Sequence, residues 1–296
     1  MKKWLILPAL FIFFTGCLTL DDNLFNNEKL TEYRLKNYTG EVDFRLDTSY
    51  NIPDSLVHLF TLSSQGPDEG SGTTIYAVYI GDINRIATDT VIMYCHGNRD
   101  HMDFYWPRAQ LLANAGGKNR YGVMMIDYRG FGMSEGKPDE NGLYADVDAA
   151  LAWLKEKGLK NRRLMIYGFS LGCAPAVKMC AHYYSLHPSK IMLEAPFASP
   201  EVMVQDGTGL ALPGGFFTSF KLNNAEEIQK VQQPFFWIHG EADDFLNVDT
   251  HGQVVYDHYQ GVYKEAHRIP GADHSTVQTT MGFTNYLKSL EEFMAK

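Results

Sequence analysis

Ser170 stands between two glycines in the pattern Gly-x-Ser-x-Gly, which Gly168 and Gly172 complete. Residues 163–167 before it form a short apolar run typical of a buried strand, and residues 173–184 after it are compatible with a helix. A strand that turns into a helix at a serine needs small flanking residues, because the turn is tight. The hydroxyl is then exposed near the N-terminus of a helix, whose dipole favours developing negative charge. The pattern therefore predicts that Ser170 is a nucleophile.

An alcohol is a weak nucleophile at neutral pH, so Ser170 needs a base, and the base needs an orienting carboxylate. Residues 234–238 form another apolar run, which ends shortly before Asp243, and the predicted last strand at residues 263–269 is followed by a turn with His274. Carboxyl ends of parallel strands meet at one rim of a sheet, so the three side chains are expected there together. We predict Ser170 as nucleophile, His274 as general base and acid, and Asp243 as the orienting acid.

Two other carboxylates compete with Asp243 for that role. Asp244 is its direct neighbour, and Glu194 ends a further apolar run from which it could reach the histidine. The other interpretation of Glu194 is that it braces the loop at residues 195–197. His239, which ends the strand before Asp243, is expected to bond its own loop.

The negatively charged oxygen that forms on a carbonyl under attack needs backbone N–H donors. The amide of Leu171, directly after the nucleophile, is expected to be one of them. The other should come from the loop after the apolar run at residues 90–95, where the amide of Asn98 is the candidate. Gly97 would leave room for the substrate, and His96 is expected to fix the loop.

In chain order, these pieces resemble the α/β-hydrolase superfamily. The match covers the His-Gly-Asn stretch ending at Asn98, the segment 127–134 (Asp-Tyr-Arg-Gly-Phe-Gly-Met-Ser), the serine turn, the His-Gly-x-x-Asp stretch and His274. Segment 127–134 is similar to the branch that holds serine aminopeptidase-like, monoacylglycerol lipase-like and protein depalmitoylase-like hydrolases. The resemblance implies the α/β-hydrolase fold and hydrolysis by a Ser-His-Asp triad. Cys173 is a departure, since many relatives carry glycine or alanine after the serine turn.

The apolar runs that position these residues predict an α/β fold. Helical patterns such as residues 141–157 separate the runs from the third onward, which favours an eight-stranded, mostly parallel sheet flanked by helices. This domain is expected at residues 51–296, with a lid-like insertion at 199–233. Within the insertion, the apolar residues 210–217 are either a lid or acyl-binding wall, or ordinary core. The predicted strands lie at about 56–64, 73–80, 90–95, 122–127, 163–168, 190–194, 234–239 and 263–269.

The N-terminus has the features of an export signal. Lys2 and Lys3 precede 11 apolar residues, fewer than the roughly 20 that a transmembrane helix needs. The following Phe-Thr-Gly-Cys stretch resembles a bacterial lipoprotein signal, cleaved before a cysteine that becomes lipidated. We therefore predict a signal peptide at 1–16, lipidation of Cys17, a lipidated N-terminus, tether and lead-in at 17–50, and location at a bacterial envelope membrane, with the periplasmic face of the outer membrane as one option. An ordinary export signal with an incidental cysteine is the alternative.

Composition limits the other classes. The chain has 296 residues, 45% of them apolar, and a formal net charge of −9 without a basic cluster, which gives no support for a nucleic-acid partner. The glycine-rich stretches lack the Lys-Ser/Thr of a phosphate loop. Cys95, Cys173 and Cys180 have neither a metal-binding spacing nor a disulfide framework. We expect no metal or other cofactor, and the sequence leaves the oligomeric state open.

These observations favour an envelope-anchored serine hydrolase that cleaves a carboxylic ester or thioester through an acyl-enzyme on Ser170, with a small-molecule or acyl substrate. A serine peptidase is the alternative. It would have to hold a substrate amine, and residues 199–233 offer only Glu201 and Asp206 for that purpose. An alternative of another class is a non-catalytic, hydrolase-like binding protein, which the intact Ser, His and Asp disfavour.

Overall fold

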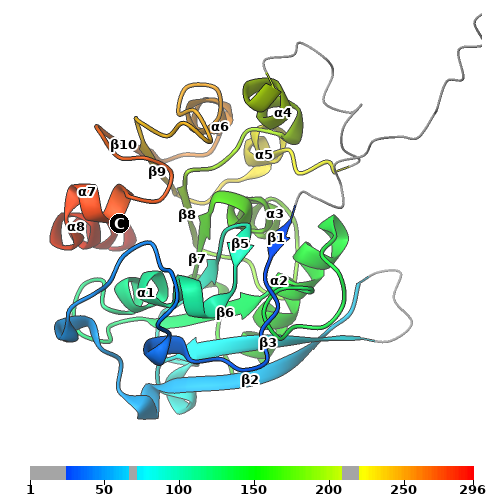
Figure 1. Cartoon of the computed structure of the whole chain (residues 1–296), viewed down its shortest axis with the longest axis vertical. Coiled ribbons are helices and arrows are strands. Elements are labelled where there is room, and N and C mark those ends of the chain that lie inside the picture. The colour runs from blue at the N-terminus through cyan, green and yellow to red at the C-terminus, as the bar shows by residue number, and fades with distance from the viewer. Residues whose placement is uncertain (1–24, 67–71, 209–219) are drawn as a thin grey trace, which may run out of the picture.

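The computed structural model describes residues 25–66, 72–208 and 220–296. Its centre is an eight-stranded sheet in the order β10-β9-β8-β7-β4-β6-β3-β2 (Figure 1). β3 runs antiparallel to both of its neighbours, and the other neighbouring pairs are parallel. The prediction of a mostly parallel eight-stranded sheet is confirmed, with strand ends within one residue of those expected. The strands are β2 Val57–Ser64, β3 Thr73–Ile80, β4 Val91–Cys95, β6 Gly122–Asp127, β7 Leu164–Phe169, β8 Lys190–Glu194, β9 Phe235–Gly240 and β10 Lys264–Ile269.

Helices cover both faces of the sheet. α1 (Met102–Ala113) and α8 (Phe283–Met294) pack on one face, and α2 (Glu140–Glu156) and α3 (Cys173–Ala181) pack on the other (Figure 1). α2 begins one residue before the expected range, and the Asp139 side chain caps it by accepting from the Gly142 N–H. α3 ends three residues earlier than the pattern predicts.

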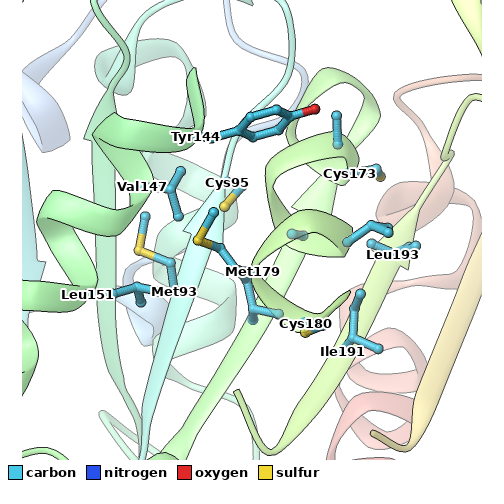
Figure 2. Packing of buried hydrophobic residues seen from close by; sticks show 14 of the residues in the cluster. Met93, Cys95, Tyr144, Val147, Leu151, Cys173, Met179, Cys180, Ile191 and Leu193 are labelled. Atoms are coloured by element: carbon cyan, nitrogen blue, oxygen red, sulfur yellow. The ribbon is translucent and has the colours of Figure 1, made fainter. Parts of the chain in front are cut away.

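The five central strands, β4, β6, β7, β8 and β9, are buried on both faces, which explains why they are apolar without alternation. In β4, Met93 and Cys95 contribute to the cluster beneath α2 and α3, whereas Ile92 and Tyr94 belong to the cluster beneath α1 and α8. Figure 2 shows the first cluster, in which side chains of β4, β8, α2 and α3 gather on one face of the sheet. Its labelled members include Met93, Cys95, Tyr144, Val147, Leu151, Cys173, Met179, Cys180, Ile191 and Leu193.

The N-terminal segment, expected to be tether and lead-in over 17–50, makes contacts with the sheet domain. Residues 18–30 are polar, but from residue 25 onward the chain lies against the domain. β1 (Asn26–Asn27) pairs in parallel with β5 (Arg99–Asp100), and Lys29 forms a further bridge to Gly132. Residues 26–29 are therefore held against the domain by backbone pairing. Cys17 and the expected signal peptide at 1–16 lie outside the described residues.

The long connection at 199–233 begins with α4 (Pro200–Thr208) and ends near α5 (Asn224–Glu227). Residues 210–217, the expected lid or acyl-binding wall, lie outside the described residues. α6 (Gly252–His258) and α7 (Val277–Met281) follow β9 and β10, respectively. No helix in the described parts of the chain is long and apolar enough to span a bilayer.

Candidate active site

Ser170 lies in the sharp turn between β7 and α3. Its φ of +52° falls in the left-handed region, which is strained for a residue with a side chain. Both flanking glycines are required by space. A Cβ on Gly168 would lie 2.6 Å from the carbonyl oxygen of Gly172, and a Cβ on Gly172 would overlap the carbonyl oxygen of Cys95. The two glycines of the Gly-x-Ser-x-Gly pattern thus allow backbone segments to approach each other closely at this turn.

The loops after β9 and β10 bring an acid and a histidine to this serine. The Nε2 of His274 lies 3.0 Å from the Oγ of Ser170, and its Nδ1 lies 2.8 Å from the Oδ2 of Asp243. Ser170 and Asp243 are buried, whereas His274 has 21% of its side chain exposed. This arrangement lets the imidazole accept the serine proton at one nitrogen while the carboxylate holds the other.

The Asp243 carboxylate accepts hydrogen bonds on both oxygens. Oδ1 accepts the backbone N–H groups of Phe245 (3.0 Å) and Leu246 (2.7 Å), and Oδ2 faces His274 and His239. Burial alone would raise the pKa of Asp243, but the hydrogen bonds from His239 and His274 hold it well below its ordinary value. The carboxylate is therefore ionised and can stabilise an imidazolium at His274.

His239 is a second histidine on this carboxylate, and sequence analysis assigned it only to its own loop. Its Nε2 lies 3.0 Å from Asp243 Oδ2 and 2.9 Å from the carbonyl oxygen of Leu246, and its Nδ1 accepts from Trp237 Nε1 at 3.4 Å. These partners place a proton on Nε2, so His239 donates to Asp243. The spacing of four residues between His239 and Asp243 was the available signal.

The structure separates the two competing carboxylates from His274. Asp244 is exposed at the surface. Glu194 is fully buried and accepts from Arg108 Nη1 (2.8 Å), Tyr167 Oη (2.5 Å) and Gln278 Nε2 (2.7 Å). Its carboxylate therefore anchors a buried network instead of bracing residues 195–197, because the charge of Arg108 offers a stronger partner than a loop amide.

Arg108 links that network to the reacting groups, and sequence analysis did not identify it. Its guanidinium forms an ion pair with Asp43 at 2.7 Å, donates to the Ser275 carbonyl oxygen at 2.9 Å, and lies 4.0 Å from the centre of the Phe169 ring. Ser275 follows His274 and Phe169 precedes Ser170, so one buried cation contacts the neighbours of both. Because the partners are far apart in the chain, no local pattern indicates this network.

The candidate oxyanion donors lie beside the serine. Asn98 and Leu171 line the same pocket as Ser170. His96 is buried beneath this loop, where its Nδ1 contacts the Gly97 carbonyl oxygen at 2.8 Å and its ring stacks on Tyr105 at 4.8 Å. The expected loop-fixing role of His96 agrees with these contacts.

An apolar pocket of about 500 Å³, a volume that includes space open to solvent, adjoins Ser170. Within the described residues, no group of three His, Cys, Asp or Glu side chains is placed to hold a metal ion. The apolar lining of the pocket includes Phe25, Phe197, Met203, Phe220, Leu222 and Leu246.

Comparisons with known proteins agree with this architecture. Residues 87–226 match the family model described as serine aminopeptidase, S33. Alpha/beta hydrolase domain-containing protein 17B is 29% identical to the chain over 210 residues in Xenopus laevis and 28% identical over 210 residues in Homo sapiens. Each match covers 69% of this chain and 66% of the relative, slightly less than two thirds of its length.

Among solved structures, the Pyrococcus furiosus esterase superimposes with a TM-score of 0.66 at 16% identity, covering 92% of this chain and 97% of the esterase. A cold-adapted esterase from an Arctic intertidal metagenomic library gives a TM-score of 0.56 at 19% identity, covering 80% and 93% of the two chains. At these identities the likeness shows the fold alone.

Proposed function

We propose that this chain is a serine hydrolase of the α/β-hydrolase superfamily that cleaves a carboxylic ester or thioester, a proposal that the family model, the relatives and the fold support. The observation that carries the proposal is the continuous hydrogen-bonded series Ser170–His274–Asp243 beside an apolar pocket. The nucleophile, the group that accepts its proton and the space for a substrate therefore lie together at one point of the sheet rim.

The geometry supports the following sequence of steps. Ser170 Oγ attacks the substrate carbonyl carbon while His274 Nε2 takes its proton, and Asp243 stabilises the resulting imidazolium. The amides of Leu171 and Asn98 are our candidates to stabilise the negatively charged oxygen. His274 then gives its proton to the departing alcohol or thiol, which leaves an acyl group on Ser170. A water molecule, deprotonated by His274, attacks this acyl-enzyme and regenerates the serine.

The pocket favours an acyl substrate over an aminoacyl one. Its polar lining residues are Asn98 and Ser170, and the others are apolar. A peptidase that holds a substrate amine would need a carboxylate close to the serine. Asp206 is occupied elsewhere, because its Oδ2 accepts from Thr250 Oγ1 at 2.5 Å and lies 3.4 Å from His251 Nε2. A serine peptidase therefore remains the second candidate function, supported by the family model that residues 87–226 match.

A substrate panel tests the proposal and its two alternatives. Initial rates would be measured with p-nitrophenyl esters and with aminoacyl p-nitroanilides, for wild type and Ser170→Ala. We expect ester turnover that the substitution lowers by at least about 10³-fold. Faster turnover of the anilides would favour the peptidase. A wild-type rate no greater than that of Ser170→Ala on every substrate would favour the non-catalytic binding protein.

We also propose that the protein is lipidated at Cys17 and attached to a bacterial envelope membrane, a proposal that rests on the sequence pattern of residues 2–17. Several acyl chains on one cysteine would provide firm attachment, whereas one chain gives marginal binding. Metabolic labelling with a fatty-acid analogue should mark wild type and not Cys17→Ser. An unlabelled wild-type protein released from the membrane fraction would show that the signal is an ordinary export signal.

A further inference from the structure

Residues ahead of the sheet contribute to the candidate active site. Phe25 lines the pocket beside Ser170, although 145 positions separate it from the serine in the numbering. Its ring meets two other aromatic rings edge to face, that of Phe131 at 6.3 Å and that of Phe220 at 5.4 Å. Phe25 also precedes the region that matches the family model, residues 87–226. This part of the pocket wall is therefore supplied outside the matched region.

Backbone pairing fixes the segment that carries Phe25. The N–H of Asn26 donates to the Asn98 side-chain oxygen at 3.2 Å, and β1 pairs with β5 in the loop that follows β4. Two hydrogen bonds then join Gly132 to the segment, one from the Gly132 N–H to the Glu28 carbonyl (2.7 Å) and one from the Leu30 N–H to the Gly132 carbonyl (2.9 Å). Figure 1 shows β1 beside β5 at the end of the sheet where α3 begins. These backbone hydrogen bonds hold the segment in place as one wall of the pocket.

We propose that Phe25 is a specificity-determining residue, against which the aliphatic acyl chain of the substrate packs. This inference rests on the proposed function and names its substrate class, esters or thioesters of an aliphatic acyl group. An aliphatic chain fits because Phe25, Phe220 and the other apolar side chains offer it contact without a charged partner. An acetyl group would leave most of the apolar lining without contact. The size of the side chain at position 25 then sets which acyl lengths are accepted.

A chain-length profile tests the inference. The ratio of kcat/KM for p-nitrophenyl dodecanoate to that for the butyrate would be measured in wild type, Phe25→Ala and Phe25→Trp. The smaller side chain should raise this ratio by about fivefold to tenfold because it leaves room for a longer chain, and the larger one should lower it because it shortens the space available. Phe60→Ala is the matched control. Phe60 is also half-buried and stacks on an aromatic ring, that of Trp153 at 4.5 Å, but lies on β2 away from the pocket.

Labelling by a fluorophosphonate separates failure of the inference from failure of the proposed function. Variants that label at the wild-type rate and keep the wild-type ratio would overturn the role of Phe25. An equal loss on every ester in both Phe25 variants would also overturn it, since it would show a purely structural role. A wild-type protein that neither labels nor hydrolyses any ester would instead overturn the proposed function.

Discussion

Replacing Asp243 by asparagine tests the hydrogen-bond arrangement around the candidate base. Four donors converge on this carboxylate, the two backbone N–H groups of Phe245 and Leu246 on Oδ1 and the two histidines on Oδ2. An asparagine offers one oxygen and one NH₂ group in their place. Whichever way the amide turns, the NH₂ group faces two donors.

The two orientations have different costs. If the NH₂ group faces the backbone, the N–H groups of Phe245 and Leu246 lose their acceptor, at about 1–3 kcal/mol for the buried one, that of Leu246. If it faces the histidines, His274 must accept at Nδ1 and carry its proton on Nε2, so it can no longer take the proton of Ser170. The corresponding substitution in serine proteases lowers kcat by about 10⁴-fold, or about 5 kcal/mol in the activation barrier. The second orientation keeps the backbone contacts, so we expect a loss of about 10³-fold to 10⁴-fold.

The assay compares kcat on p-nitrophenyl butyrate for wild type, Asp243→Asn and Asp244→Asn. The neighbouring exposed carboxylate is the control, and its substitution should change kcat by less than about threefold. Thermal melting would confirm that each variant is folded. A loss of less than tenfold for Asp243→Asn, or a larger loss for Asp244→Asn, would refute this reasoning.

Three other substitutions probe the structure around the site. Gly172→Ala should lower the free energy of unfolding by about 3 kcal/mol or prevent folding, because its Cβ would overlap the last carbonyl oxygen of β4. Gly271→Ala is the control for urea denaturation. It has φ +76° but open space around its Cβ, so it should cost about 1 kcal/mol. Burial lowers the pKa of His251 to about 4 in the folded protein. As the pH is lowered from 6.5 to 4, this histidine is protonated in the unfolded chain before it is protonated in the folded one. The free energy of unfolding should therefore decrease over this range, by up to roughly 3 kcal/mol. His251→Gln should flatten this part of the stability profile, and an unchanged slope would exclude the histidine as its source. Arg108→Met should cost about 3–5 kcal/mol, because it leaves the buried Glu194 and the half-buried Asp43 without their cation. Arg85→Gln on the exposed surface should cost less than about 1 kcal/mol, and similar melting temperatures for the two variants would contradict the buried network.

Local sequence patterns predict the sheet and the serine turn. The strands are apolar runs bounded by polar or glycine-rich stretches, and their carboxyl ends share one rim because the sheet is parallel. This geometry alone makes Ser170, Asp243 and His274 neighbours in the structure, although 31 and 104 positions separate His274 from the other two. The expected positions of the strands and of these three residues therefore follow from periodicity and connection order.

Contacts between distant and irregular segments have no such pattern. β1 has two residues and lies in a polar stretch, so neither length nor alternation distinguishes it from a tether. The pair of Arg108 and Glu194 joins residues 86 positions apart, and its burial depends on the packing of α1 against the sheet. Asp243 has a second histidine partner because the backbone after β9 turns back on itself, as the Leu246 N–H to Asp243 hydrogen bond records. These features require tertiary structure to be recognised.

Covalent labelling of Ser170 tests the central claim most directly. Wild-type protein would be treated with a fluorophosphonate, digested and mapped by mass spectrometry, beside Ser170→Ala and His274→Ala. We expect one adduct, on the peptide that contains Ser170, absent from Ser170→Ala and formed far more slowly in His274→Ala, because the nearby imidazole activates the hydroxyl. An adduct that forms on Ser170→Ala at the wild-type rate, or that maps to another residue in wild type, would contradict the account.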